Sequence, residues 1–554
     1  VRRYLDGRPV LAHPDSLRYR AGRWMKRHRT AAIAAAIAVV GLLTGLGVAL
    51  YQAQVARAHA ARAERRFGEV RKLAGAILFE HFDMIRELPG ATKAKESMAK
   101  LSQEYLNSLA GEADDPELVL ELANAYRRLA EVQGAPGAPN LGQIPQARAN
   151  FRKAVELLDR LPRAKWNEPP VLDAAINTVW RLSRLLQNDG QFEEAQRLAG
   201  RQAELAGRLY AMRPEVANSA YQYLTALRSL STIASRRGDL NAAVKHAEEA
   251  LRMGDRIVGK DASPQLRGAQ AANYQTLADA VWKQGDLHRA WKLYETYVKL
   301  FGELAALRPN EQYFTHAVYF GHYKLGKIDS EFLRLNLGNG ARAERHCGEY
   351  LDWAQRMWKA DAADVLARQS MGFGRLCVGA AIAMRSPKDG LRLLQEGAEQ
   401  MREELRKRTT QASRVNAAFV LFVLAETQAA AGQREAAMAT YAESMALWDS
   451  LDGEKLSAED GVDLMLANRQ FARRTGDVER ARKAVKLAAA DGLLQEIVHA
   501  AEAREVLAEV SPADRCAALG EAEALWQKAR QHAFTAAMAE KRLRAISLGD
   551  CGRH

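Results

Sequence analysis

The sequence has 554 residues and a net charge of +13. A chain of this length exceeds one ordinary domain, so we expect several structural units or a repeat array. The charge distribution argues against nucleic-acid binding, because residues 1–30 carry +7, residues 51–75 carry +4, and the long remainder 76–554 carries only +2.

The first predicted element in chain order is a transmembrane helix over residues 31–51. No residue between Arg29 and Arg57 is charged, and most of the run is Ala, Val, Leu, Ile and Gly. Twenty-one helical residues span about 30 Å, the thickness of a bilayer's hydrocarbon core. A buried core helix, a cleaved signal peptide and an amphipathic interfacial helix all fit less well, because the run excludes every charge, is too long and has no polar face.

The flanks of this helix predict its orientation in a plasma (inner) membrane. Six basic residues crowd its N-terminal edge between Arg18 and Arg29, whereas the next cation on the other side is Arg57. The positive-inside rule then places residues 1–30 in the cytoplasm and the chain from residue 52 onward outside it. A second basic group from Arg57 to Arg66 weakens this asymmetry.

Residues 52–92 are predicted to form a helical stem. Apolar residues recur at three- and four-residue steps from Phe67 to Leu88, and Pro89 and Gly90 end the pattern. Two interpretations stay open: a plain connector, or a signalling stalk through which two copies form a homodimer.

A short phrase then recurs along the chain: Gly, usually Asp or Gln next, and Ala five residues after the glycine. Its copies begin at Gly142, Gly190, Gly238, Gly285, Gly338, Gly432 and Gly476, with a degenerate copy, "SPKDGL", at 386–391. The steps between copies are 44 to 53 residues. Each copy is typical of the turn in a helical hairpin, where Gly ends one helix, Asp or Gln begins the next, and the small Ala lets the two pack closely.

This pattern resembles the tetratricopeptide repeat, although the step here exceeds the usual 34 residues. Longer helices or added linkers would account for the difference. The resemblance implies an all-α fold in which stacked helical hairpins form an α-solenoid. We therefore expect a single transmembrane helix followed by a tetratricopeptide-like solenoid over residues 93–490, with capping helices over 491–554.

The opening segment "VRRYLDGRPVLAHPDSLRYRAGRWMKRHR" resembles the region that joins the catalytic lobe to the membrane helix in bacterial receptor-like serine/threonine kinases with extracytoplasmic tetratricopeptide sensors. The segments 65–92 and 125–134 are similar to the same family. The resemblance implies that residues 1–30 are a cytoplasmic juxtamembrane remnant that follows a kinase domain. Because the chain starts at Val1 rather than Met, we interpret it as a fragment or a processed product.

No catalytic residue, metal site or cofactor is predicted for this chain. It lacks the Gly-rich loop, the Val-Ala-x-Lys lysine, the His-Arg-Asp loop and the Asp-Phe-Gly motif of kinases, so we expect no kinase activity from it alone. His316 and His322 are six residues apart and do not share a helical face. Four cysteines are expected to be free thiols, with a Cys516–Cys551 bridge as the alternative.

The leading functional hypothesis is the membrane-anchored sensor and protein-interaction region of a receptor-like serine/threonine kinase, with a protein or peptide ligand. The alternative is a membrane-anchored repeat scaffold without enzymatic output. In the resembling repeat family, ligand contacts come from the first helix of each hairpin. Counting back from three turn glycines gives these candidate residues: Asn177, Trp180, Arg184, Gln187 and Asn188; Thr225, Arg228, Thr232, Ser235 and Arg236; Gln275, Asp279, Trp282 and Lys283.

Overall fold

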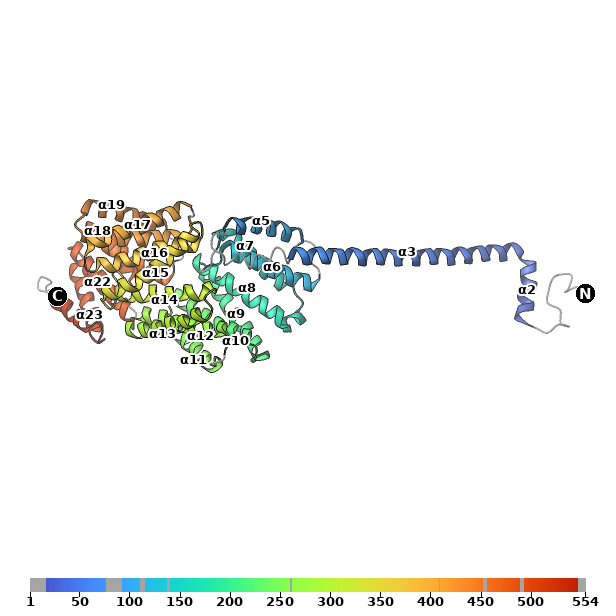
Figure 1. Cartoon of the computed structure of the whole chain (residues 1–554), viewed down its shortest axis with the longest axis horizontal. Coiled ribbons are helices and arrows are strands. Elements are labelled where there is room, and N and C mark those ends of the chain that lie inside the picture. Colours follow the sequence, from blue (N-terminus) through green and yellow to red (C-terminus); the bar gives the residue numbers. More distant parts are fainter. Residues whose placement is uncertain are drawn as a thin grey trace, which may run out of the picture. The chain divides into compact units, whose positions relative to one another are not determined.

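The computed structural model describes residues 16–75, 92–109, 115–136, 140–259, 262–407, 409–451, 456–488 and 493–546. These residues are helical apart from turns and short connections, and no strand occurs among them. The chain divides into two units, residues 1–80 and 81–554 (Figure 1).

The first unit contains a short helix and a very long one. Helix α2 (Leu17–Arg27) is capped by the hydroxyl of Ser16, which accepts a hydrogen bond from the Tyr19 N–H. Helix α3 (Arg29–Gly75) is continuous, so the predicted transmembrane segment and the start of the predicted stem belong to one helix. Its portion Arg29–His59 is long and apolar enough to cross a membrane, and none of its most apolar stretch is buried inside the chain. The break predicted at Pro89 and Gly90 lies outside the described residues.

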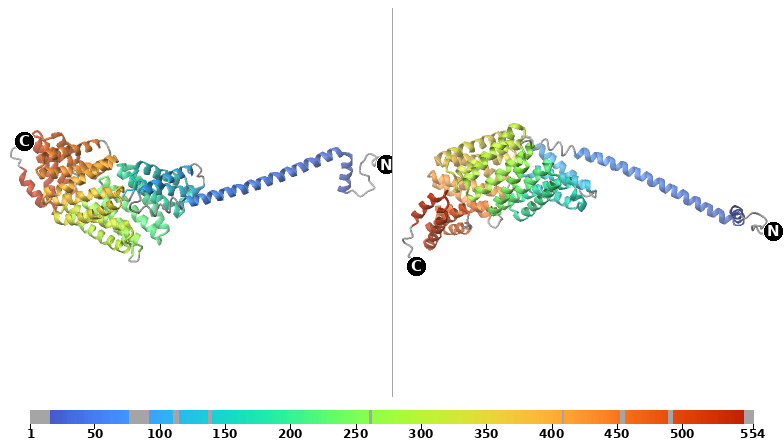
Figure 2. Two further views of the ribbon diagram at one scale, coloured as in Figure 1. Left: turned by 45° about the horizontal axis from the view of Figure 1, so that its top comes forward. Right: turned by 90° about the horizontal axis from the view of Figure 1, so that it is seen from below.

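The second unit is a series of antiparallel helices in which each helix packs on the next along the chain (Figures 1 and 2). It begins with α5 (Thr92–Leu109). Paired helices follow: α6 (Pro116–Gly134) with α7 (Ile144–Asp159), α8 (Pro169–Asn188) with α9 (Phe192–Met212), α10 (Ala217–Arg236) with α11 (Leu240–Ile257), α12 (Pro264–Gln284) with α13 (Leu287–Leu307), and α14 (Gln312–Ser330) with α15 (Gly340–Ala360). The later pairs are α16 (Val365–Ala383) with α17 (Pro387–Lys407), α18 (Gln411–Ala430) with α19 (Arg434–Ser450), α20 (Ala458–Thr475) with α21 (Val478–Leu487), and α22 (Leu494–Val510) with α23 (Arg515–Arg530), before α24 (Ala536–Ala545). This is the predicted tetratricopeptide-like solenoid.

The predicted turn glycines all have the expected left-handed backbone. Glycines with positive φ in the described chain are the seven that begin the repeated phrase, with φ from 71° to 98°. Other residues adopt this conformation at a cost, which is why glycine recurs at this point of the hairpin. The prediction of helical hairpins at these seven positions is confirmed.

The residue that follows each glycine caps the next helix only when it is short. The carboxylates of Asp239, Asp286 and Asp477 each accept a hydrogen bond from an N–H three residues on. Gln143 and Gln191 make no such bond, because glutamine is not among the side chains that favour this position.

The alanine five residues after each glycine is buried, as predicted. Its exposed fraction is 0–2% at Ala147, Ala195, Ala243, Ala290, Ala343, Ala437 and Ala481. Hydroxyl groups of the preceding helix reach two of these positions: Ser183 donates to the Ala195 carbonyl at 2.8 Å, and Ser231 donates to the Ala243 carbonyl at 2.7 Å. A larger side chain would separate the two helices at this point.

Helix length accounts for the long repeat step. Helices α8, α9, α10, α12 and α13 have 20 or 21 residues each, so one pair and its turns fill about 47 residues. Added linkers account for less of it: residues 208–220, for example, are mostly the end of α9 and the start of α10.

The degenerate copy at 386–391 also forms a hairpin turn, between α16 and α17. One expectation is wrong nearby: Cys347 of α15 and Cys377 of α16 form a disulfide bond, with Cα atoms 5.5 Å apart, and are not free thiols. Sequence spacing missed this bond because two separate hairpins bring the cysteines together. The alternative bridge from Cys516 involves Cys551, which lies outside the described residues.

Helices far apart in the sequence also meet. Helix α10 contacts α20, and α12 contacts α22, so hairpins five repeats apart pack together. A shared hydrophobic core joins Trp282 and Tyr294 with Leu494, Ile497 and Trp526. We call these contacts the closure. Two turn glycines take part in it: a Cβ at Gly238 would lie 3.3 Å from that of Ala458, and one at Gly285 would lie 3.2 Å from that of Leu494.

We expect Gly285→Ala to destabilise the full chain more than Gly432→Ala does. Both glycines have positive φ, 98° and 87°, so each alanine costs about 1 kcal/mol in backbone strain. Only at Gly285 must Leu494 also move, since nothing lies within 4 Å of a Cβ at Gly432. The measurement is the urea midpoint of helix loss in detergent. Equal shifts for the two variants would show that the closure contact is absent in solution.

Candidate functional site

The predicted site residues lie on the first helix of each hairpin, and these helices adjoin one another. Helix α8 contacts α6 and α10, and α12 contacts α10 and α14. We call the surface that α6, α8, α10, α12 and α14 share the first-helix surface. Along α8 the candidates recur at three- and four-residue steps from Asn177 to Gln187, and along α10 from Thr225 to Ser235, so these residues share one helix face; Asn188 and Arg236 come one residue later.

Several candidates form hydrogen bonds within their own helix. The amide of Asn177 donates to the Asp173 carbonyl, and that of Gln187 donates to the Ser183 hydroxyl. The Thr232 hydroxyl donates to the Arg228 carbonyl. Gln187 and Thr225 are buried, whereas Asn188 and Thr232 are exposed.

The half-buried indole of Trp180 is the centre of an arginine-rich site. The guanidinium carbon of Arg181 lies 4.3 Å from the ring centroid of Trp180, and that of Arg184 lies 5.6 Å from it. Both distances are within the range of cation–π attraction. Arg181 also pairs with Glu131 of α6 at 3.3 Å.

Arg228 of α10 extends this site toward α12. Its guanidinium donates to the Ala269 carbonyl at 3.4 Å and to the Thr225 hydroxyl at 3.1 Å. Burial raises the pKa of Tyr313 of α14, and the charges of Arg228 and Arg184 oppose this shift; the residue as a whole is 56% exposed. We call Trp180, Arg181, Arg184, Arg228 and Tyr313 the arginine–aromatic cluster. Arg236, two turns beyond Arg228 on the same face, is half-buried.

The α12 candidates differ from those of α8 and α10, because other side chains of the same chain form ion pairs and hydrogen bonds with them. Lys283 forms an ion pair with Glu459 of α20 at 2.9 Å and donates to the Ser235 hydroxyl at 3.2 Å. Asp279 accepts hydrogen bonds from Lys324 at 2.9 Å and from Tyr294 at 2.6 Å, and Gln275 donates to it at 3.5 Å. Trp282 is buried, with the ammonium groups of Lys324 and Lys327 near its ring.

These ion pairs continue beyond α14 into the closure. Lys327 pairs with Glu331 at 2.8 Å, and the nearly buried Arg334 pairs with Asp463 of α20 at 2.5 Å. Burial raises the pKa of Asp463 to about 6 despite this arginine. In contrast, the pKa of Glu459 lies well below its usual value, chiefly because of Lys283 and then Arg334, although burial opposes the shift. The arrangement therefore holds α20 against α12 and α14 by charge.

An open pocket of about 770 Å³ also lies at the closure. Its walls come from the α10–α11 turn, α20 and the start of α22, and they include Lys283, Arg334, Glu459 and His499 with many aliphatic side chains. Burial lowers the pKa of His499, so this imidazole is neutral at pH 7.

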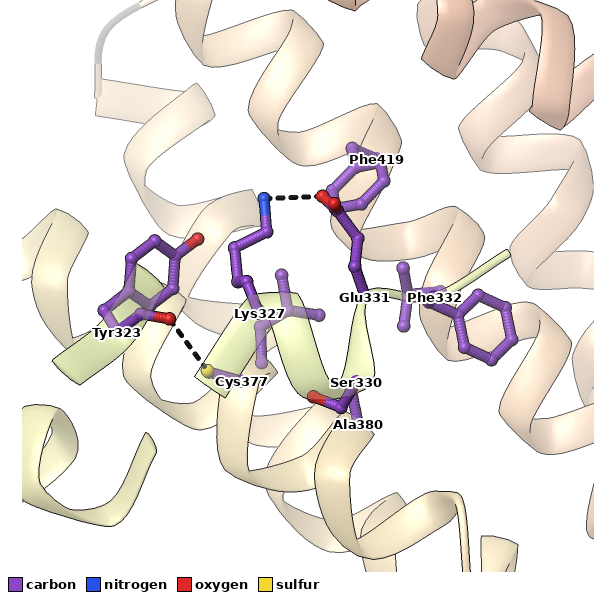
Figure 3. A pocket seen from close by; sticks show the side chains of 10 residues that line it. Tyr323, Lys327, Ser330, Glu331, Phe332, Cys377, Ala380 and Phe419 are labelled. Carbon is purple, nitrogen blue, oxygen red and sulfur yellow. Dashed lines mark hydrogen bonds and ion pairs between the residues drawn. The ribbon is translucent and has the colours of Figure 1, made fainter. Parts of the chain in front are cut away.

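A much smaller pocket, of about 30 Å³, lies beside the Lys327–Glu331 ion pair (Figure 3). Phe332, Phe419 and Ala380 line it, and the sulfur of Cys377 lies 3.9 Å from the Tyr323 carbonyl oxygen. It has room for about one water molecule and is too small for an organic ligand.

The two histidines considered in the sequence do not meet each other. The ring of His316 lies against Phe320 and Trp353, and burial lowers its pKa to about 4. His322 instead meets His346 of α15, with Nδ1 atoms 2.8 Å apart. The described residues contain no group of three or more side chains that could hold a metal ion.

Sequence reasoning found Trp180, Arg184 and Arg228 but missed two members of the cluster. Arg181 follows Trp180 directly, so its reach back over the indole depends on its rotamer. Tyr313 lies between Gly285 and Gly338, the longest step between copies, at 53 residues. The pairing of Lys283 with Glu459 was also missed, because 176 residues separate the two.

No protein-family model matches the sequence, and no curated protein matches it either. Solved structures with similar folds are helical-repeat proteins at low identity. A Rap protein in complex with competence and sporulation factor is 12% identical, with a TM-score of 0.43 over 78% of this chain and 98% of that one. Aspartyl phosphate phosphatase F from Bacillus subtilis is 12% identical, with a TM-score of 0.40 over 74% and 93%. Yeast Tom70 is 13% identical, with a TM-score of 0.30 over 82% and 97%.

We expect Glu459→Gln to weaken the closure in a pH-dependent way. Because the folded pKa of Glu459 is below 4.5, its ionised form stabilises the fold above that pH, and the contribution is lost as the pH falls through the folded pKa. The stability difference between wild type and Glu459→Gln should be largest near pH 7 and shrink below pH 4.5. Urea midpoints from pH 7 to pH 3 measure it.

The control is Glu215→Gln, which changes an exposed carboxylate between α9 and α10. It should leave the urea midpoint unchanged at every pH. A Glu459→Gln effect that is the same at pH 7 and pH 3 would rule out the Lys283 ion pair as its cause.

Proposed function

We propose that this chain is a membrane-anchored receptor region whose tetratricopeptide-like solenoid binds a protein or peptide outside the cytoplasm. The arginine–aromatic cluster carries the proposal, because Trp, Tyr and Arg are the residue types that dominate binding energy at protein interfaces. A half-exposed site on rigid, packed helices can present these side chains in a fixed geometry.

The exposed surface of α3 supports membrane anchoring. Side chains such as Ile37, Leu42, Leu43 and Leu46 are 58–73% exposed, and no polar face balances them. A helix that is apolar on all sides is stable when something apolar covers it, and lipid chains would do so. The basic residues of α2 suit anionic headgroups at the cytoplasmic edge.

The Cys347–Cys377 bond supports an extracytoplasmic position for the solenoid. Disulfide bonds persist in oxidising compartments and are rare where thiols are kept reduced. Both cysteines are buried, so the bond joins two hairpins in the interior of the repeat array.

The finer part of the proposal is that a serine/threonine kinase domain precedes Val1 and that the solenoid is its sensor. It rests on the resemblance of residues 1–30, 65–92 and 125–134 to that family. The alternative, a membrane-anchored scaffold, would share the solenoid and the helix but have no catalytic lobe. The gene sequence upstream of Val1 decides between the two.

The topology can be tested with two reporters fused after His554 in bacterial cells. We expect alkaline phosphatase, which is active only outside the cytoplasm, to be active there, and a fluorescent reporter that matures only in the cytoplasm to be dark. Replacing Arg23, Lys26, Arg27 and Arg29 by Asn should reduce phosphatase activity, because the charge bias is removed. A bright fluorescent fusion with an inactive phosphatase would reverse the orientation.

Peptide binding can be tested with the detergent-solubilised full chain on an array of peptides of mixed composition. Replacing Trp180, Arg184 and Arg228 together by Ala should lower affinity for bound peptides at least tenfold, which is about 1.4 kcal/mol. Helicity should be kept, since surface changes usually cost within about 0.5 kcal/mol each.

The matched control replaces Arg213, Arg256 and Arg308 by Ala, three exposed arginines near the ends of α9, α11 and α13. It should bind the same peptides as wild type. If the array shows no peptide whose binding depends on the cluster, the proposed receptor function fails.

A further inference from the structure

The cations of the first-helix surface fall into two groups. On α12, α14 and the following loop, Lys283, Lys324, Lys327 and Arg334 each have a carboxylate within ion-pair distance. On α8 and α10, neither Arg184 nor Arg228 has such a carboxylate among the described residues. The chain thus pairs the cations of one half of this surface and leaves Arg184 and Arg228 of the other half without a carboxylate partner among the described residues, although Arg181 there pairs with Glu131.

Two carboxylates of α6 and α8, Glu131 and Asp173, are already engaged by other side chains. Glu131 accepts from Arg127 at 2.6 Å as well as pairing with Arg181. Asp173, at the start of α8, accepts from the Asn218 amide at 2.7 Å. No rearrangement within these pairs would supply Arg184 with a counter-charge without leaving another group unpaired.

The proximity of these arginines without a full set of counter-charges destabilises the folded state. Burial, together with the charges of Arg181 and Arg228, lowers the pKa of Arg184 to about 10. A lowered arginine pKa means that its positive charge is poorly solvated and repelled by its neighbours. Such unneutralised charge is a cost to the folded state that a bound anion would remove.

The donors that remain are suited to carboxylates. Arg184 makes no hydrogen bond within the described chain, so its five N–H groups are free, and the two contacts of Arg228 leave its Nε–H free. Planar guanidinium groups bind carboxylates with two parallel hydrogen bonds. Tyr313, on which the charges of both arginines act, is 56% exposed and offers a ring for the aliphatic part of an acidic side chain.

The same geometry disfavours nucleic acid. Arg181 lies 4.3 Å from the Trp180 ring centroid and covers that face against a stacked base. The remaining positive surface is also short, because the ion pairs of α12 and α14 end it.

We propose that the arginine–aromatic cluster binds an acidic peptide segment, whose carboxylates pair with Arg184 and Arg228. This inference rests on the proposed receptor function and specifies the chemistry of its ligand. The acidic side chains would complete the charge pattern of the first-helix surface, as Glu459 and Asp463 do for its other half.

The test uses the detergent-solubilised full chain and fluorescein-labelled octaglutamate, octaglutamine and an eight-nucleotide oligothymidylate, with binding followed by fluorescence anisotropy. We expect octaglutamate to bind at least tenfold more tightly than either other probe. Arg184→Gln with Arg228→Gln should weaken octaglutamate binding at least tenfold. The same double variant should unfold at an equal or higher temperature than wild type, because repulsion is relieved.

Arg213→Gln with Arg308→Gln removes the same charge from exposed positions and should bind octaglutamate as wild type does. If the Gln variant loses helicity, Arg184→Lys with Arg228→Lys replaces it, which keeps the charge but removes paired hydrogen bonding and should still weaken binding. Octaglutamate binding that is absent, or unchanged in these variants, would overturn the inference. So would cluster-dependent binding that is tightest for the oligonucleotide.

Failure of this inference is distinguishable from failure of the receptor function. Neutral or basic peptides that bind on the array and depend on Trp180 would contradict the acidic ligand alone. An array without any cluster-dependent peptide would contradict both.

Discussion

The left-handed turn glycine is the constraint on which the solenoid depends. At five of the seven, only two or three residues separate the paired helices, and at Gly142 and Gly338 a longer connection ends in the left-handed glycine; in each case the following helix returns along the preceding one. The buried alanine five residues later then sets the distance between the two helices, and the repeated distance allows hairpin to stack on hairpin. Without the tight reversal the alanines would face no partner, and the first helices would not share a surface.

This dependence explains how much the sequence could predict. The glycine and the alanine act locally, so their spacing predicted the hairpins, the solenoid and the faces that carry Trp180, Arg184 and Arg228. The closure, the Lys283–Glu459 pair and the Cys347–Cys377 bond join segments that no local pattern relates. Their positions follow from the small rotation between successive hairpins. This rotation accumulates over the array and cannot be predicted from the sequence of any single repeat. Lys283 therefore seemed as available for a ligand as Arg184, although the chain itself engages it.

Electrostatics divide the first-helix surface into a structural half and a free half. In the structural half, buried cations and carboxylates satisfy one another, and removing a single partner would leave an uncompensated charge. In the free half, Arg184 lies beside the Trp180 ring without a counter-ion among the described residues, and Arg228 also has none there. Both halves use the same helix positions, and part of the difference arises from the closure, because Glu459 and Asp463 of α20 pair with Lys283 and Arg334. The long-range fold thereby determines where a ligand could reach.

The closure has a consequence for how such a protein can evolve. Open repeat arrays commonly lengthen or shorten by duplication or loss of whole repeats, because each repeat contacts only its neighbours. Here α10 meets α20 and α12 meets α22, and the turn glycines 238 and 285 fit against Ala458 and Leu494. Gain or loss of one hairpin between these partners would bring different side chains into register and separate Lys283 from Glu459. The number of repeats between α10 and α22 is thus fixed by contacts across the array, and variation in copy number is confined to the hairpins outside that interval.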